Sequence, residues 1–530
     1  MLRSAVLAVA LTVVLSAQNT PLDVAIVNVG AGGGRLINGL AGVAGALTGT
    51  IGIRAGRIVS IGAADIANAR AVVDATGMVV APGFIDVHSH GLETLGRAAL
   101  RNADAELAQG VTTIVGNPDG GGPVDLAKQR ATLEGSGGIG VNVALLIGHG
   151  SVRDAVLGGA NRAPTADELA KMLALVKQAV ADGAFGMSSG IFYTPGRYAK
   201  TDELIALAHA AGGVYTSHIR DEGNYDAGVV ASVDEVIRVA EEAKVTGIVT
   251  HMKALGPDSW GLSATLIANI EAARKRGVNV WADQYPYEAS STSLAAAVLP
   301  GVTTADARAR LADAAKKPAL LADAKENIRR RGGPHSIAIA SSSAGSGRSA
   351  SAYAAVSMNG KRLDEIAAAV GVSAEQAAID IILDGGASIV SFNMSEDDIR
   401  AIMRQDWTMT SSDGALSLPG EGVPHPRNNG AFARKLGVYV RERKVITLEQ
   451  AILSMTSLPA RVFGFKDRGS IRTGAIADIA IFDSAKIVDR ATYDNPHQLA
   501  TGVSAVIVNG QVAWKDGKGT GARAGQVLNK

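Results

Sequence analysis

The sequence predicts an α/β fold: a (β/α)₈ barrel of the TIM type with an inserted subdomain, plus a small β-sandwich domain formed from both chain ends. After Pro82, eight short β-rich runs alternate with longer helical stretches, which is the pattern of a parallel sheet. Eight strands with intervening helices is the count of a closed barrel. The segments before and after this region are β-rich, with glycine-rich turns and no helical periodicity.

The composition limits what the chain can be. Its 530 residues include 47% hydrophobic and 19% charged residues, enough apolar material for a large core. The 51 Lys and Arg against 50 Asp and Glu leave a net charge of +1, whereas nucleic-acid binders carry a basic surplus. Cysteine is absent, which excludes disulfides, thiolate zinc sites and Cys nucleophiles. Any metal must therefore be held by His, Asp, Glu or a modified Lys.

The first 17 residues are predicted to be a signal peptide. Arg3 supplies the positive start, Ala5–Leu15 supplies an apolar run of the right length, and Ser16–Ala17 forms a cleavage site. We therefore expect a periplasmic or secreted protein that is free of the membrane after cleavage. An uncleaved anchor is the alternative.

Residues 21–81 and 465–530 are predicted to form the small β domain together. The expected strands of the first segment are residues 23–27, 52–54, 57–61 and 71–74. The second segment contains Asp478–Phe482, Ala505–Val508 and, after an Asn-Gly turn, Gln511–Trp514.

Residues 82–464 are predicted to form the barrel. Its expected strands are residues 84–88, 112–116, 142–147, 184–188, 213–218, 247–251, 279–283 and 407–411. The clearest helices between them are residues 165–182, 201–211, 232–245 and 263–276, and such helices often open with Asp or Thr and close with Gly.

The stretch from Tyr285 to Asp406 is too long for a loop. It shows helical patterns at residues 304–330 and 363–383, so we expect an inserted subdomain over about residues 288–405. Its position before the eighth strand would allow it to cover the strand ends as a lid.

Five metal-compatible side chains follow predicted strands. His88 and His90 end the first strand two residues apart, so they point to the same side. His218 and His251 end the fifth and sixth strands, and Asp413 follows the eighth. Active sites of such barrels lie at the C-terminal strand ends, so the pattern predicts a metal centre there. His149 ends the third strand; for it, substrate contact and a structural role are both open.

Several motifs carry a family resemblance. The segment Ala81–His90 (APGFIDVHSH) resembles the first-strand motif of the amidohydrolase superfamily. Further segments resemble those of the N-acyl-D-amino-acid deacylases, or D-aminoacylases: Ser188–Gly196, Tyr215–Glu222, Thr250–Lys253, Tyr285–Tyr287, His425–Arg427, Ser454–Arg461 and Gly474–Asp483. The resemblance spans roughly residues 22–525.

The resemblance implies a zinc hydrolase with one or two ions, although another divalent metal is possible. It places His88 and His90 at one metal position, and His218 and His251 at the other. Asp413 would be the catalytic acid and base and a possible ligand. Arg427 would bind the substrate carboxylate. The substrate pocket would be lined by Tyr193, Tyr287 and Ser291, and Lys253 would point to the same side as His251.

One departure from the family pattern concerns the second strand. The family has a Cys ligand after Gly-Asn, whereas this chain has Pro118 at that position and Asp119 next to it. Asp119 could supply an oxygen ligand if the turn shifts by one residue. The fourth strand has no Lys, so a carboxylated lysine is not available there. Two His with a carboxylate suit zinc, or Mn or Fe.

The resemblance implies cleavage of the amide bond of small N-acyl-D-amino acids. A metal lowers the pKa of bound water to about 7, and the resulting hydroxide attacks the carbonyl. Asp413 would take a proton from that water and pass it to the leaving nitrogen. Two alternatives stay open: an amidohydrolase of dipeptides or cyclic amides, and an inactive secreted barrel that only binds. The sequence does not indicate an oligomeric state.

Overall fold

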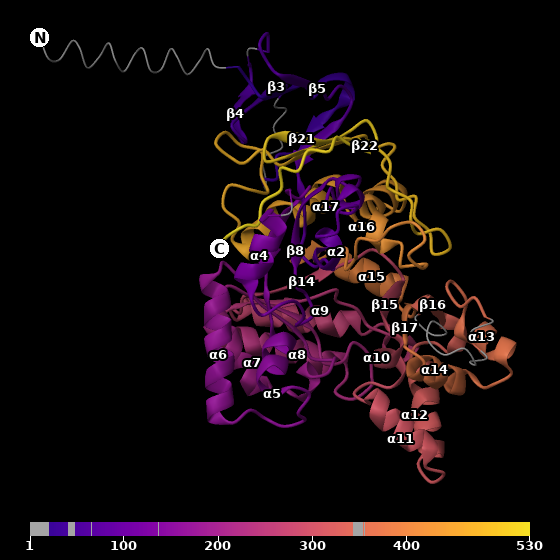
Figure 1. Cartoon of the computed structure of the whole chain (residues 1–530). Coiled ribbons are helices and arrows are strands. Elements are labelled where there is room, and N and C mark those ends of the chain that lie inside the picture. The colour runs from indigo at the N-terminus through magenta and orange to yellow at the C-terminus, as the bar shows by residue number, and fades with distance from the viewer. Residues whose placement is uncertain (1–20, 41–47, 65, 136, 343–352, 354–355) are drawn as a thin grey trace, which may run out of the picture.

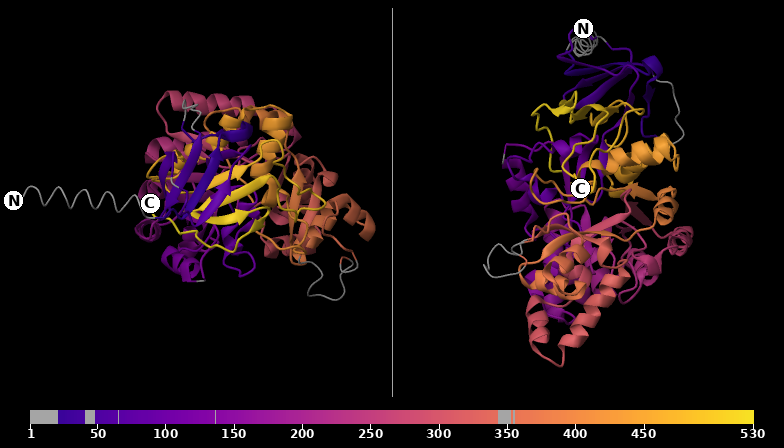
Figure 2. Two further views of the ribbon diagram at one scale, coloured as in Figure 1. Left: turned by 90° about the horizontal axis from the view of Figure 1, so that it is seen from above. Right: turned by 90° about the vertical axis from the view of Figure 1, so that its right-hand side faces the viewer.

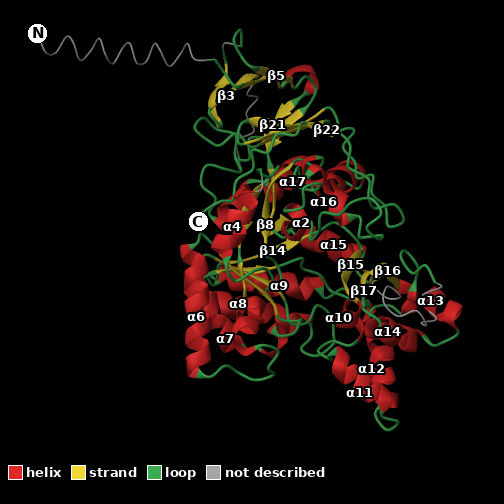
Figure 3. Ribbon diagram, in the orientation of Figure 1, coloured by secondary structure: helices red, strands yellow, loops and turns green. Residues whose placement is uncertain are grey.

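Parallel strands form the centre of the protein, and helices pack around them (Figures 1 and 3). The computed structural model describes residues 21–40, 48–64, 66–135, 137–342, 353 and 356–530, so the predicted signal peptide lies outside the described residues. The barrel strands are β7 (Phe84–Asp86), β8 (Val111–Gly116), β9 (Asn142–Leu145), β10 (Ile147–Gly148), β11 (Gly186–Gly190), β12 (Val214–His218), β13 (Thr246–Val249), β14 (Val280–Gln284) and β18 (Thr408–Thr410).

The strands pair in the order β7-β8-β9 and β10-β11-β12-β13-β14-β18, and every pairing is parallel. The third predicted strand is split into β9 and β10 at Leu146. Beyond β7 and β18, the Asp413 amide donates to the His88 carbonyl at 2.9 Å, and the His90 amide donates to Gly414 at 2.8 Å. These bonds join the first and last strands. The predicted fold class is confirmed, and each of the eight predicted runs overlaps an observed strand.

The helices around the barrel form where apolar periodicity and caps predict them. On α8 (Val229–Ala243), the buried residues Val233, Val236 and Ala240 recur every three or four positions, which places them on one face. Thr165 and Glu168 form a capping box at the start of α6 (Ala166–Ala181): the side chain of each accepts a hydrogen bond from the backbone amide of the other. The other helices of this region are α2 (Leu92–Leu95), α3 (Asp104–Leu107), α4 (Leu126–Gly135), α5 (His149–Leu157), α7 (Thr201–Ala211), α9 (Ser263–Lys275), α15 (Glu396–Met403), α16 (Arg427–Arg434), α17 (Leu448–Met455) and α18 (Ser457–Phe463).

Strands from both chain ends lie side by side over one end of the barrel (Figures 1 and 2). One sheet has the order β4-β3-β1-β5 and the other β2-β6-β19-β20-β21-β22. Their bounds are β1 (Val24–Val29), β2 (Arg35–Leu36), β3 (Gly49–Arg54), β4 (Arg57–Gly62), β5 (Ala71–Asp74), β6 (Val79–Pro82), β19 (Ile479–Phe482), β20 (Val503–Val508), β21 (Gln511–Lys515) and β22 (Lys518–Gly519). Apolar residues of both sheets, including Ile51 and Ile481, form one core. Phe482 contacts Phe84, at the opposite end of β7 from His88, with ring centroids 6.0 Å apart.

The inserted segment forms a subdomain with a core of its own. Its helices are α10 (Leu294–Val298), α11 (Thr304–Ala312), α12 (Lys317–Arg330), α13 (Leu363–Val370) and α14 (Ala374–Leu383). It also contains an antiparallel sheet of order β15-β17-β16, from β15 (Ala289–Ser293), β16 (Ile337–Ser342) and β17 (Ala387–Phe392). The sequence did not predict this sheet, because β15 reads ASSTS and has no apolar alternation.

Among the described residues, no single helix is long and apolar enough to cross a membrane. The pair α13 and α14 meets the length and composition test jointly, with a 90° bend between the two helices.

Lys435 is a buried cation behind β18. Its Nζ donates to Thr410 Oγ1 at 2.7 Å and to Ser454 Oγ at 3.0 Å, and no carboxylate of the described residues pairs with it. Burial lowers the pKa of Lys435 to about 7, against about 10.4 in an unfolded chain. Between these pH values the unfolded chain binds a proton that the folded chain does not, so stability rises with pH.

Replacing Lys435 with Met is therefore expected to remove this rise. The parent should gain up to about 1.4 kcal/mol in the free energy of unfolding, relative to K435M, for each pH unit between 7 and 10. Urea unfolding across this range measures the difference, with the exposed Lys466→Met as control. If the free energies of unfolding of the parent and K435M changed with pH in the same way, the lowered pKa of Lys435 would be contradicted.

Candidate metal centre

Six side chains converge beyond the C-terminal ends of five barrel strands. His88 and His90 follow β7, and Asp119 lies in the loop after β8. His218 ends β12 and His251 follows β13. Asp413, after β18, completes the cluster. Each had been predicted as a possible ligand, because parallel strands bring their C-terminal ends to one edge of the barrel.

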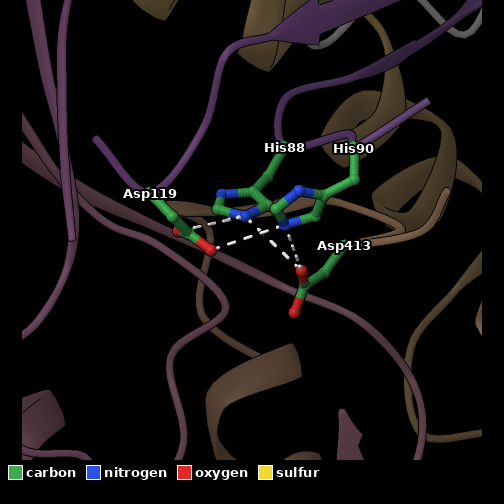
Figure 4. Close-up of side chains that lie close together, drawn as sticks. All are labelled: His88, His90, Asp119 and Asp413. Carbon is green, nitrogen blue, oxygen red and sulfur yellow. Dashed lines mark ion pairs between the residues drawn. The ribbon is translucent and has the colours of Figure 1, made fainter. Parts of the chain in front are cut away.

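The first set of ligand atoms is shown in Figure 4. Asp119 Oδ1 lies 3.4 Å from His88 Nε2, and Asp119 Oδ2 lies 3.4 Å from His90 Nε2. Asp413 Oδ1 lies 3.5 Å from His88 Nε2 and 3.4 Å from His90 Nε2. Two nitrogens and two carboxylates therefore surround one point.

The second set shares Asp119 with the first. Asp119 Oδ2 lies 3.8 Å from His218 Nδ1, and Asp119 Oδ1 lies 3.6 Å from His251 Nε2. The two imidazoles face each other, with His218 Nδ1 and His251 Nε2 3.0 Å apart. The Asp119 carboxylate thus faces all four histidines and lies between the two sets.

The donor set fits a divalent metal. His88 Nε2 and Asp119 Oδ1 are buried and have no hydrogen-bond partner of good geometry, which is unfavourable unless a ligand satisfies them. Bond lengths of about 2.0–2.2 Å in a tetrahedral site place neighbouring ligand atoms about 3.4 Å apart. The separations in the first set match this spacing.

Buried charges govern protonation of the cluster. Burial raises the pKa of Asp119, but the charge of His88 and hydrogen bonds from the histidines outweigh it and hold that pKa well below its usual range. Burial likewise raises the pKa of Asp413, but Arg427, with Nη1 2.7 Å from Asp413 Oδ2, lowers it well below its usual range. Burial lowers the pKa of His218 to about 4. The two carboxylates and the neutral His218 have the forms that bind metals. Burial lowers the pKa of His88, but Asp119 and Asp413 outweigh it and raise that pKa to about 10, so His88 would release a proton on binding a metal.

The backbone at three of these residues is strained. Asp119, His251 and Asp413 have φ values of 55°, 36° and 49°. Non-glycine residues seldom adopt such left-handed conformations, which concentrate at functional sites. In the loop after β8, the side-chain Nδ2 of Asn117 donates to the Leu146 carbonyl at 3.0 Å, and the Gly120 backbone amide donates to Ser188 Oγ at 3.1 Å. These bonds hold the turn that directs Asp119, rather than Pro118, to the cluster.

A second layer of carboxylates orients the ligands. Asp86 accepts from the Ser412 amide at 2.9 Å and also from the Ser412 hydroxyl, which ties β7 to the Asp413 loop. Asp283 accepts from the His251 amide at 2.9 Å. Glu222 Oε1 lies 3.0 Å from His251 Nδ1. The sequence alone indicates no role for these three carboxylates.

A cavity of about 230 Å³ opens at the cluster. Three of the predicted substrate residues, Tyr193, Ser291 and Lys253, line it. Tyr193 packs against the His218 ring at 4.6 Å between centroids and shares a hydrogen bond with Thr292. Lys253 Nζ lies 2.8 Å from His251 Nδ1 and pairs with Glu222.

Three other predicted substrate residues lie outside the cavity wall. Arg427 lies behind Tyr285, 4.8 Å from that ring, and pairs with Asp413. The Tyr287 hydroxyl donates to the Pro426 carbonyl at 3.4 Å. His149 is buried at the start of α5, with Nε2 3.0 Å from Glu203 Oε1, a contact that favours the structural alternative. The substrate roles of these residues stay predictions.

Comparisons with known proteins agree with this geometry. Residues 71–513 match the sequence model of the amidohydrolase family. The chain is 36% identical to an N-acyl-D-glutamate deacylase of Alcaligenes xylosoxydans xylosoxydans, over 90% of this chain and 92% of the relative. It is 34% identical to a D-aminoacylase of the same organism, over 90% and 93%.

A solved structure shares the whole architecture. It is an N-acyl-D-glutamate deacylase of Bordetella bronchiseptica, in complex with zinc and a phosphonate mimic of the tetrahedral intermediate. The two chains are 33% identical, with a TM-score of 0.78, and the match covers 96% of this chain and all of the other.

Proposed function

The chain belongs to the amidohydrolase family, and from this membership we propose that it is a metal-dependent hydrolase that releases D-amino acids from small N-acyl-D-amino acids. One observation carries the proposal. Asp413 lies beside a four-histidine cluster and opens onto the same cavity as Tyr193, Ser291 and Lys253. Relatives that match nine-tenths of the chain are deacylases of this class.

The chain's own residues define where a metal would be held. His88, His90, Asp119 and Asp413 would hold one ion, and Asp119, His218 and His251 a second. When bound, a divalent ion such as zinc supplies Lewis acidity that polarises a carbonyl and acidifies water.

Asp413 has the position and charge of the proton carrier. Arg427 keeps it ionised, so it can accept a proton from the attacking water. It then returns that proton to the amide nitrogen, because an amine leaves only when it is protonated. The products are the carboxylate of the acyl group and the free D-amino acid.

We assign the substrate α-carboxylate to the two cations that flank Tyr285. Lys253 Nζ and Arg427 Cζ lie 5.5 and 4.8 Å from the centre of this ring, which itself lines the cavity. Nη1 of Arg427 pairs with Asp413 Oδ2 at 2.7 Å, whereas its Nε makes no hydrogen bond of good geometry. A planar guanidinium that keeps a free donor suits a carboxylate.

The test is hydrolysis of paired N-acetyl-D- and N-acetyl-L-amino acids by the mature chain loaded with zinc. We expect D-selective release of the amino acid, lost on treatment with chelator and restored by adding zinc back. Release from neither enantiomer by protein with metal bound would rule out the deacylase proposal.

Export is the part of the proposal that rests on sequence alone. Arg3 and the apolar run Ala5–Leu15 support a cleaved signal peptide. We propose that the mature chain acts in the periplasm or outside the cell.

A further inference from the structure

Arg331 is a buried cation in the wall of the cavity. It follows α12 in the inserted subdomain, its side chain is 2% exposed, and it lines the same cavity as His90, Asp119 and Asp413. A residue of the subdomain therefore reaches the site that the barrel strands build.

The hydrogen bonds of Arg331 leave its charge uncompensated. Its Nε donates to the Tyr225 hydroxyl at 2.7 Å, and Nη1 lies 3.2 Å from the end of the Asn393 side chain, whose oxygen accepts from it when the amide is turned by 180°. No carboxylate of the described residues pairs with its guanidinium. Buried charges are costly unless an opposite charge accompanies them, so an anion is expected to come from outside the chain.

The two other cations at the site already have carboxylate partners. Lys253 pairs with Glu222, and Arg427 pairs with Asp413 at 2.7 Å. These two cations flank Tyr285, where we placed the α-carboxylate. Arg331 lies instead with Tyr225 and its hydroxyl, and Ser290, Ser291 and Thr292 add hydroxyl groups to the cavity wall.

We infer that Arg331 binds a second carboxylate of the substrate, on the side chain of the amino acid. This inference rests on the proposed function and narrows it to acidic D-amino acids such as N-acyl-D-glutamate. Sequence identity does not distinguish an acidic from a neutral substrate side chain, since the chain is 36% identical to an N-acyl-D-glutamate deacylase and 34% identical to a D-aminoacylase. A neutral side chain would leave the buried guanidinium uncompensated.

The experiment compares the isosteric pair N-acetyl-D-glutamate and N-acetyl-D-glutamine, with N-acetyl-D-leucine as a third substrate. In Arg331→Met, kcat/KM for the glutamate derivative should fall about 100-fold, through KM, with a change of less than about threefold for the other two. Arg331→Lys should recover part of the loss. The matched control is Arg330→Met, because Arg330 belongs to α12, pairs with Glu326 and lines a neighbouring pocket.

Binding gives a readout that does not depend on turnover. By calorimetry, the zinc-loaded parent should bind D-glutamate more tightly than D-glutamine, and R331M should lose that difference. Equal losses on all three substrates, or no loss on any, would overturn the inference, provided that circular dichroism shows a folded variant. If the parent were inactive on every substrate, the proposed function would be refuted but the role of Arg331 would not. The comparison of D-glutamate and D-glutamine binding by the parent and R331M would still decide that role.

Discussion

Asp413→Asn is expected to lower kcat by about 10²- to 10⁴-fold, because the variant keeps the shape of the side chain but loses the group that accepts and returns the proton. The Asp413 carboxylate is ionised beside Arg427 and faces two histidines. Steady-state hydrolysis of an N-acetyl-D-amino acid by zinc-loaded protein measures the effect.

Two controls separate proton transfer from metal binding and folding. Elemental analysis of D413N gives its metal content, and a normal content with low kcat supports proton transfer. Asp406→Asn is the matched variant, because Asp406 is an exposed aspartate before β18 whereas Asp413 follows that strand. D406N should keep parental activity. A kcat for D413N within tenfold of the parent would exclude Asp413 as the proton carrier.

The barrel and its ligands could be predicted because both depend on local pattern. His88 and His90 share a strand end, and parallel strands bring His218, His251 and Asp413 to the same edge. In the structure His88, His90 and Asp413 belong to one group of candidate ligands and His218 and His251 to a second, and Asp119 is common to both.

The features that the sequence did not predict depend on contacts between distant segments. Glu222 meets His251 and Lys253 only after two loops fold over the barrel. Arg331 reaches the cavity only because the inserted subdomain packs beside it. The strand β15 has no apolar alternation and forms only because β17 pairs with it. No local periodicity encodes these placements.

Asp119 is the residue on which both metal positions depend. Asp119→Ala is expected to reduce the metal retained per chain at both positions after dialysis, and to lower activity by more than about 100-fold, since even residues outside the ligand set change metal affinity by about 10–100-fold. Its carboxylate faces all four histidines at 3.4–3.8 Å. Elemental analysis and zinc titration measure the loss. An unchanged zinc content in D119A would show that the histidines and Asp413 suffice.

Asp119→Cys sharpens this test, because the chain has no cysteine of its own and the variant carries a single thiol. A zinc-bound thiolate is deprotonated and shielded, so zinc should slow its reaction with a thiol reagent, and chelator should restore the rate. The softer ligand should also favour zinc over manganese more strongly than the parent carboxylate does. Equal thiol reactivity with and without zinc would place residue 119 outside the metal site. Protection with retained activity would show that residue 119 is the metal ligand of the turn after β8, one residue along the chain from the position of Pro118.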